Sequence, residues 1–189
     1  MRLPIHRRLF YSHFLAVILV SGSIGTLFYR IAVSSLHESL RARLMNSAAL
    51  LARTLDAAEL EGIRTADDAL GEAYLRHLAT VRDFQAANRD LAFVYVMRRD
   101  GDLISFVIDS DSSGEQALPG EAYEEEIPAL RRGFDELAAD DEITEDRWGW
   151  FLSGYAPLRN GVGRYLVGID MRADEVARKF RRLRIAGVL

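Results

Sequence analysis

A long uncharged run near the start is the feature that most constrains what this chain can fold into. Leu9 to Tyr29 contains no Asp, Glu, Lys or Arg. At about 20 residues it is long enough to cross the hydrocarbon core of a bilayer as a helix. Residues 1–8 are basic and carry no acidic side chain. By the positive-inside rule, the sequence predicts a cytoplasmic segment at 1–8, a transmembrane helix at 9–29 and an exported segment after it.

A cleaved signal peptide is the alternative interpretation of this run. Such a peptide has a shorter apolar core and small residues at its cleavage site. Here the apolar run is long, and Leu27, Phe28 and Tyr29 stand where small residues would be needed. The sequence therefore favours an uncleaved anchor.

Composition narrows the possible functions of the remainder. The chain has 189 residues, no cysteine and a formal net charge of -4. The length allows one folded domain plus additional segments. The lack of cysteine excludes disulfides, thiolate zinc sites and a cysteine nucleophile. All acidic residues lie after Tyr29, and an acidic middle of the chain argues against a nucleic-acid-binding surface.

A helical pattern follows the apolar run. Leucines recur at helical spacing from Arg30 to about Leu60, and no Gly or Pro interrupts residues 31–61. We expect an unbroken helix whose apolar stripe packs on a sheet, on the same helix of a second subunit, or on both in turn. Residues 62–65 break the pattern, and Thr65 is a suitable cap for a further helix that fades near Asn88.

Strand patterns begin after this second helix. Two β-rich runs flank Asp100-Gly101, a hairpin turn signal. In order, the sequence predicts strands at Leu91–Met97 and Leu103–Ile108, a loop at Asp109–Gly120, a helical region at Ala122–Leu137 and an acidic loop at Asp140–Asp146.

A second hairpin is predicted from Asp146 to Met171, around Asn160-Gly161. This dipeptide is typical of a type I′ turn, which needs positive φ at both central residues. One face carries bulky apolar residues and suits a core: Trp148, Trp150, Leu152, Tyr165, Val167, Ile169 and Met171. The other face carries small residues, aromatic rings and the carboxylate of Asp170, and is predicted to recognise a ligand.

The chain ends in a basic helical pattern from Ala173 to Leu189. Its apolar end, Ile185–Leu189, is too short to span a bilayer. Two alternatives stay open. Either this end is the start of a second membrane helix that has been cut off, or a basic helix lies along a membrane surface.

Four segments, in their order along the chain, resemble a known family. FVYVMRRDGDLISFVIDSD, PGEAY, DRWGWFLSGYAPL and VGIDM together resemble the membrane-distal half of a bacterial extracytoplasmic Cache sensor domain. The resemblance covers about Ala32 to Val176. It implies an α+β, PAS-like fold: an antiparallel sheet with a long N-terminal helix, here preceded by a transmembrane helix. The implied organisation is a sensor domain at 30–176, and a basic helix at 177–189 leading into a second, truncated transmembrane helix.

The resemblance also implies a function. Cache domains sit between two membrane helices and control diguanylate cyclases, nucleotide cyclases, histidine kinases, chemoreceptors or phosphatases. We therefore expect a homodimeric, ligand-sensing domain on the periplasmic side of a bacterial inner membrane. Its ligand would be an amino acid, a carboxylate or an amine. Arg147-Trp148 matches the aromatic-Arg-aromatic signature of amino-acid-binding members only in part, so the ligand class stays open.

Carried over by position, six residues are expected to line the pocket: Tyr95, Tyr123, Arg147, Trp148, Tyr155 and Asp170. Aromatic rings would exclude water, Arg147 would pair with a carboxylate and Asp170 would hold an amine. Each has a structural alternative. Trp148 would be core, Arg147 a solvated strand end, and Asp170 a cap of the following helix.

No catalytic group, metal or cofactor is expected. Asp109–Gly114 imitates the start of a calcium loop, but Gly120 stands where the loop needs its bidentate Glu. The main rival to a sensor is a dimerisation or protein-interaction module with a collapsed pocket. A third class is an envelope hydrolase that uses carboxylates such as Asp109 and Asp111.

Overall fold

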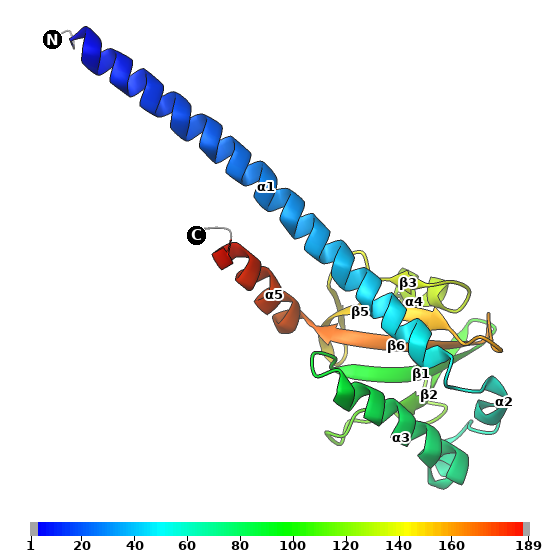
Figure 1. The fold of residues 1–189 in the computed structure, drawn as a ribbon. Coiled ribbons are helices and arrows are strands. Elements are labelled where there is room, and N and C mark those ends of the chain that lie inside the picture. Colours follow the sequence, from blue (N-terminus) through cyan, green and yellow to red (C-terminus); the bar gives the residue numbers. More distant parts are fainter. Residues whose placement is uncertain (1–3, 187–189) are drawn as a thin grey trace. The chain divides into compact units, whose positions relative to one another are not determined.

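The chain has an α+β fold with a long N-terminal helix and an antiparallel sheet (Figure 1). The computed structural model describes residues 4–186, of which residues 182–186 are described by their backbone alone. Ser39–Arg178 forms one compact unit, and the segments on either side of it belong to a second. The helices are α1 (Ile5–Ala52), α2 (Ala57–Leu60), the 3-10 helix η1 (Ala66–Leu70), α3 (Glu72–Ala87), α4 (Pro128–Gly133) and α5 (Ala173–Ala186).

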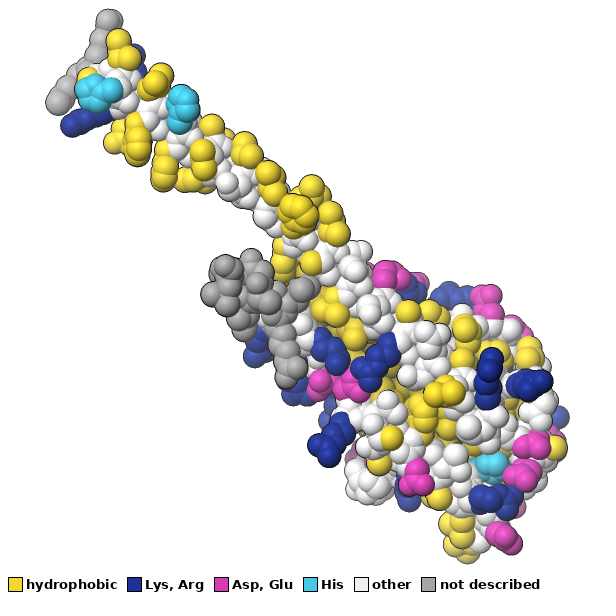
Figure 2. Space-filling model, viewed as in Figure 1, with side chains coloured by type: hydrophobic (Ala, Val, Ile, Leu, Met, Phe, Trp, Pro, Cys, Tyr) yellow, Lys and Arg dark blue, Asp and Glu magenta, His cyan; other side chains and the backbone are white. Residues whose placement is uncertain are grey.

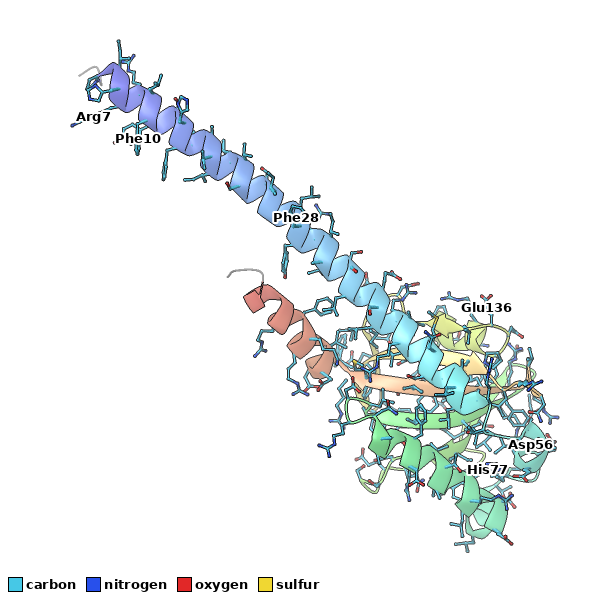
Figure 3. All side chains as sticks on the ribbon, in the orientation of Figure 1. Arg7, Phe10, Phe28, Asp56, His77 and Glu136 are labelled. Carbon is cyan, nitrogen blue, oxygen red and sulfur yellow. The ribbon has the colours of Figure 1, made fainter. Side chains whose placement is uncertain are left out.

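The N-terminal part of α1 carries the uncharged run. Its apolar side chains, including Phe10 and Phe28, extend outwards from the helix (Figure 3) and cover it in the space-filling view (Figure 2). Within residues 4–186, α1 is the one helix long and apolar enough to cross a membrane, judged by length and composition. This supports an association with a membrane.

The C-terminal half of α1 packs into the compact unit. Its buried residues recur at helical spacing: Leu40, Leu44, Ala48, Leu51 and Ala52. The helix lies directly on the sheet, because a Cβ atom on Gly154 would be 2.5 Å from the Cβ atom of Leu44. This part of the predicted apolar stripe therefore belongs to the core of the domain.

The predicted unbroken helix to Leu60 is wrong, because α1 ends at Ala52. After this end the carboxylate of Asp56 accepts a hydrogen bond from Ala58 N (2.9 Å) and caps the separate short helix α2. The predicted cap at Thr65 forms, but it starts the short 3-10 helix η1, and α3 begins separately at Glu72 after Gly71. Thr65 and Asp68 form a reciprocal capping box at the start of η1.

The sheet is antiparallel, with strand order β2-β1-β6-β5-β3, and β4 pairs with β5. The strands are β1 (Phe93–Asp100), β2 (Leu103–Asp109), β3 (Ala138–Ala139), β4 (Thr144–Asp146), β5 (Gly149–Pro157) and β6 (Tyr165–Arg172). The predicted hairpin between β1 and β2 is confirmed, with Gly101 (φ +66°) at its first central position, as in a type II′ turn. The central β1–β6 pair joins the two hairpins into one sheet.

The second hairpin forms, but its predicted type I′ turn is wrong. Neither Asn160 nor Gly161 has positive φ. The connection runs from Pro157 to Tyr165, the strand ends of β5 and β6. The side chain of Asn160 is used in a tertiary contact instead. Its Oδ1 accepts from Ala57 N (3.2 Å), and its Nδ2 donates to Asp56 Oδ1 (2.6 Å). The dipeptide thus ties the loop to α2.

The two faces of the sheet have different covers. The C-terminal half of α1 and α3 lie over one face (Figure 1). The predicted apolar residues Leu152, Val167, Ile169 and Met171 are fully buried, which confirms that they belong to a core. The second face carries a separate hydrophobic cluster that includes Tyr95, Phe106, Tyr123, Leu130 and Phe134, the latter two from α4 and its C-terminal end.

The predicted helical region Ala122–Leu137 is mostly not helical. Only Pro128–Gly133 forms a helix, and Pro128 stands at its first turn, where its missing N–H costs nothing. The residues before it extend along β2 instead. Phe106 N donates to Glu121 O and Tyr123 N donates to Ile104 O, each at 2.9 Å. This pairing carries Tyr123 onto the second face of the sheet.

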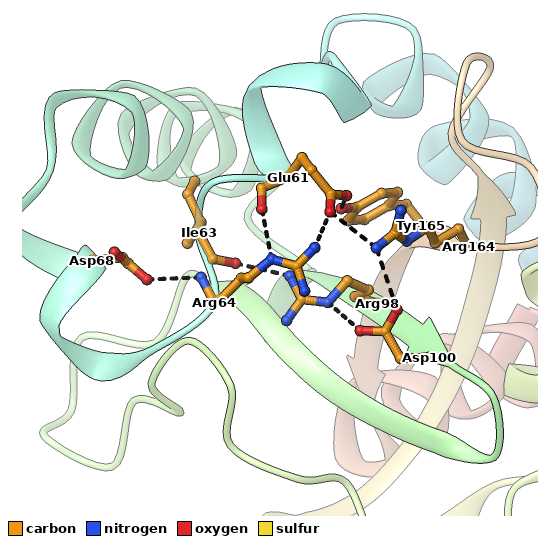
Figure 4. A network of polar contacts seen from close by, with 8 residues as sticks. All are labelled: Glu61, Ile63, Arg64, Asp68, Arg98, Asp100, Arg164 and Tyr165. Carbon is orange, nitrogen blue, oxygen red and sulfur yellow. Dashed lines mark hydrogen bonds and ion pairs between the residues drawn. The ribbon is translucent and has the colours of Figure 1, made fainter.

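A polar network fastens the segment between α2 and η1 to the sheet (Figure 4). The buried guanidinium of Arg98 donates to Ile63 O (3.0 Å) and to Asp100 (2.9 Å). Arg164 bridges Glu61 (3.0 Å) and Asp100 (3.4 Å). Because Arg98 lies in β1 and Arg164 directly precedes β6, the network joins both central strands to the helical segment.

Candidate functional site

A cavity lies on the second face of the sheet. Its free volume is about 20 Å³, which is room for one water molecule. This is far below the roughly 300–1,000 Å³ that is typical of small-molecule sites. Its walls are aromatic and acidic: Phe93, Tyr95, Met97, Phe106, Asp109, Asp111, Tyr123, Asp146, Trp148 and Asp170.

Strands β1 and β6 form the floor of this cavity. Phe93, Tyr95 and Met97 alternate along β1, so they share one face. Tyr95 stands opposite Gly168 of β6. A Cβ atom on Gly168 would lie 2.1 Å from Tyr95 Cε2. The absence of a side chain at 168 is therefore what allows the ring of Tyr95 to lie flat along β6.

Asp170 is the deepest charged group of the site, with 4% of its surface exposed. Its Oδ1 accepts a hydrogen bond from the Tyr95 hydroxyl at 3.0 Å. Burial raises the pKa of Asp170 well above its usual value, and hydrogen bonds from Ser153 and Tyr95 offset this only in part. Among the described residues that line the cavity none is basic, so this carboxyl is buried there without a paired cation.

The aromatic walls form a connected set. The rings of Tyr123 and Trp148 are stacked, with centroids 6.2 Å apart and an interplanar angle of 5°. Phe106 meets Tyr95, Tyr123 and Trp148 edge to face, at centroid distances of 6.0, 5.9 and 5.4 Å. Such offset and T-shaped pairs stabilise one another beyond their buried area, so the rings hold a fixed apolar wall.

Asp146 sets the position of Trp148. Its Oδ1 accepts from Trp148 N (2.8 Å) and Gly149 N (3.0 Å), which closes the turn between β4 and β5. The predicted shared face of Trp148 and Trp150 is wrong, because Gly149 (φ +140°) interrupts the alternation where β5 begins. Trp148 turns into the cavity, and Trp150 is 56% exposed. Burial raises the pKa of the Asp146 carboxyl.

Two further carboxylates stand where β2 ends. Asp109 accepts from Asp111 N (3.1 Å) and Ala117 N (2.8 Å), and burial raises its pKa. Asp111 accepts from the backbone and hydroxyl of Ser113, at 2.9 and 2.7 Å. Within residues 4–186, no group of His, Cys, Asp or Glu side chains is close enough to hold a metal ion. The oxygens of Asp109 and Asp111 instead organise the loop.

Asp140 forms a second buried acidic group, outside the cavity walls. It accepts from Ser153 N (3.0 Å), Thr144 Oγ1 (3.2 Å) and the Tyr155 hydroxyl (3.3 Å). Burial raises its pKa to about 6 despite these bonds. Tyr155 therefore points to Asp140, and its ring packs against Gly133 of α4.

The structure brings four of the predicted residues together at the cavity: Tyr95, Tyr123, Trp148 and Asp170. Tyr155 does not line it, for the reason just given. Arg147 also lies outside the walls. Its guanidinium covers the ring of Trp148 at 4.0 Å from the centroid and pairs with Glu121 at 2.5 Å. Both partners are substantially exposed, so Arg147 does not face a ligand inside.

Other lining residues were missed by sequence reasoning. Phe93 and Met97 alternate with Tyr95 along β1 and therefore lie on the same face of the sheet. The β1–β2 turn places Phe106 opposite Met97, so strand alternation could have predicted all three as lining residues. Asp109 and Asp111 drew attention only as a metal or hydrolase candidate. Asp146 had no signal, because its place depends on the local turn around Gly149.

No family model matches this chain, and no curated protein matches it significantly.

Proposed function

We propose that this chain is the ligand-sensing, extracytoplasmic part of a bacterial transmembrane signalling protein, with a PAS-like fold of the Cache type. Its anchor would be the apolar part of α1, placing the sheet domain on the periplasmic side of the inner membrane. The output module would be a cyclase, kinase or chemoreceptor domain outside this sequence, and the working unit a homodimer. The domain itself performs no catalysis in this proposal.

The observation that carries the proposal is the composition of the cavity. A buried carboxyl without a paired cation costs folding free energy unless hydrogen bonds compensate for its burial. Here Asp109 and Asp170, both buried, meet aromatic rings in one cavity. Apolar walls with a few convergent polar groups are typical of small-molecule sites.

The chain's connectivity offers a route for the signal. Asp170 lies in β6, and β6 runs directly into α5 at Ala173. The loop and α4 that cover the second face would close onto the ligand. Binding shifts a two-state equilibrium only if the ligand prefers one arrangement, so the closed arrangement must bind more tightly. The readout would be a changed position of α5 relative to α1 in the dimer.

The rival function is a dimerisation or protein-interaction module with a collapsed pocket. The small free volume, about 20 Å³ for water-sized spheres, is the observation in its favour. In such a module the aromatic residues of the cavity wall are part of the hydrophobic core. The rival function does not explain why Asp170 is buried at the cavity without a paired cation among the lining residues, which is why we rank it second.

A thermal-shift screen of the full chain in detergent micelles separates the two. The screen covers amino acids, carboxylic acids, amines and divalent cations. A ligand at a hundred times its dissociation constant adds about 2.7 kcal/mol to the folding free energy, which is a clear melting shift. The shift should disappear in Asp170→Asn and persist in Asp102→Asn, a control that removes an exposed carboxylate on the β1–β2 turn. A blank screen together with a concentration-dependent melt would favour the rival.

A further inference from the structure

The cavity is strongly unbalanced in charge. Asp109, Asp111, Asp146 and Asp170 all contribute to its walls, and no Lys, Arg or His does. Arginines contact several wall residues from outside the cavity, among them Arg172, whose guanidinium lies 5.8 Å from the ring centroid of Phe93. Arg147 pairs with Glu121 outside the walls, and Arg82 donates to the backbone oxygens of Ser110 (3.3 Å) and Asp111 (2.8 Å).

The unbalanced charge has an energetic consequence. Buried carboxylates need a cation or several hydrogen bonds to stay ionised. Burial raises the pKa of Asp109, Asp146 and Asp170, and the charges of Arg82 and Arg147 offset this only in part at Asp109 and Asp146. A positively charged occupant would supply a cation within the cavity.

The aromatic wall indicates which kind of cation fits. Ring faces attract ammonium groups, and the attraction grows when the cation is desolvated. Tyr123, Trp148 and Phe106 place such rings beside the carboxylates. A bare metal ion gains little from apolar walls. Within the described residues, moreover, the acidic groups do not converge into a metal site.

One polar group of the wall also lacks a partner. Tyr123 is 9% exposed, and its backbone N–H bonds to Ile104 O. Its hydroxyl forms no hydrogen bond within residues 4–186, although it lines the cavity. Because this oxygen is open to the cavity and not sealed in the core, a ligand N–H or hydroxyl group can reach it.

We propose that the cavity, widened beyond the room for one water molecule that it has in this structure, binds a small organic cation, an amine or quaternary ammonium compound without a carboxylate. This inference rests on the proposed function and narrows its ligand class. A free amino acid or a dicarboxylate is excluded, because its negative group would meet acidic walls with no basic side chain among them. Asp170 and Asp146 would pair with the ammonium group, and Trp148 and Tyr123 would cover its apolar surface.

The test is calorimetric titration of the full chain in nanodiscs. The probes are choline and putrescine, with their uncharged isosteres dimethylbutanol and butanediol, and with glycine, succinate and magnesium ion for comparison. We expect at least one of the two cations to bind, and its isostere to bind at least tenfold more weakly. Asp170→Asn and Asp146→Asn should each weaken the cation at least tenfold. Asp102→Asn should leave it unchanged.

Substitutions of Trp148 provide a second, independent part of the test. Trp148→Phe keeps an aromatic face and should retain most of the affinity, whereas Trp148→Leu should lose at least fivefold more. An isostere that binds as tightly as its cation would overturn the inference. So would magnesium, glycine or succinate binding in an Asp170-dependent way, although the proposed sensor function would then stand. If no probe binds and the broader screen is also blank, both proposals fail together.

Discussion

The hydroxyl of Tyr95 donates a 3.0 Å hydrogen bond to Asp170, two residues along the neighbouring strand from the position it faces. The diagonal contact is possible only because Gly168, directly opposite Tyr95, has no side chain to lift the ring. A glycine in a strand interior usually weakens the strand. Here it fixes the position of the cavity's deepest carboxyl.

Gly168→Ala should therefore remove the Tyr95–Asp170 bond. The new Cβ atom would lie 2.1 Å from Tyr95 Cε2, so the ring must move. We expect a loss of about 1–3 kcal/mol in the free energy of unfolding, measured by denaturant titration. Gly62→Ala is the matched control, because its Cβ would meet nothing within 4 Å. Equal effects of the two substitutions would contradict the close packing of Tyr95 on β6.

Stability should rise as the pH falls from neutral towards about 5. Burial raises the pKa of Asp140 to about 6, so the folded state binds a proton more tightly than the unfolded state. The stability from that proton is complete below the unfolded pKa of about 3.9 and is lost as the pH rises through about 6. Asp109, Asp146 and Asp170 are shifted in the same direction. Melting temperatures of the ligand-free chain across this range check the sign.

Asp140→Asn should flatten that pH dependence. The amide cannot ionise, yet its oxygen can still accept from Ser153 N and Thr144 Oγ1. At pH 7.5 we expect the variant to be more stable than the wild type, by about 1–3 kcal/mol. At acid pH the difference should shrink towards zero. A variant that loses more stability at neutral pH than at acid pH would show that Asp140 is ionised in the folded state.

The two tryptophans should differ in solvent contact. In Trp150→Phe the remaining Trp148 lies among aromatic rings, and in Trp148→Phe the remaining Trp150 is 56% exposed. Acrylamide should therefore quench the fluorescence of the first variant about two- to threefold less steeply, in proportion to the exposed ring. Similar quenching of both would mean that Trp148 and Trp150 share a face, as simple alternation predicts.

Arg98→Met should destabilise the domain far more than a surface arginine substitution. The change leaves Ile63 O without its buried partner, at a cost of about 1–3 kcal/mol. Arg131→Met is the comparison, since Arg131 pairs with Glu126 at the surface, and such pairs contribute about 1 kcal/mol or less. Denaturant titration of both variants measures the difference. Comparable losses would argue against the network in Figure 4 as a structural tie.

Sequence periodicity predicted the regular parts of this fold well. The alternation of Leu152 with Ser153 and of Ile169 with Asp170 assigned the two faces of the sheet correctly. The first hairpin was also predictable, because Gly101 supplies the positive φ that its turn needs. In these stretches the local sequence pattern and the tertiary packing favour the same secondary structure.

Prediction failed where a side chain forms a contact with a residue distant in sequence, and this contact overrides the secondary structure that the local segment favours. Asn160 bonds to α2 instead of forming a tight turn, and Asp56 caps a separate short helix after α1 has ended. Tyr123 lies in a segment with helical spacing that pairs with β2 instead. Arg147 stacks on the outer side of Trp148. None of these partners is close in sequence, so no short window contains them.

Ser153 and Gly154 are consecutive residues of β5 that serve opposite sides of the sheet. Ser153 pairs in register with Asp170 at the cavity, whereas Gly154 bears directly on the backbone of α1 at Leu44 and Met45. No flexible side chain separates strand from helix there, and close-packed interiors compress very little. An occupant beside Asp170 that displaces β5 at Ser153 therefore also displaces the adjoining Gly154. Because Gly154 lies against the backbone of α1, this displacement is passed on to α1.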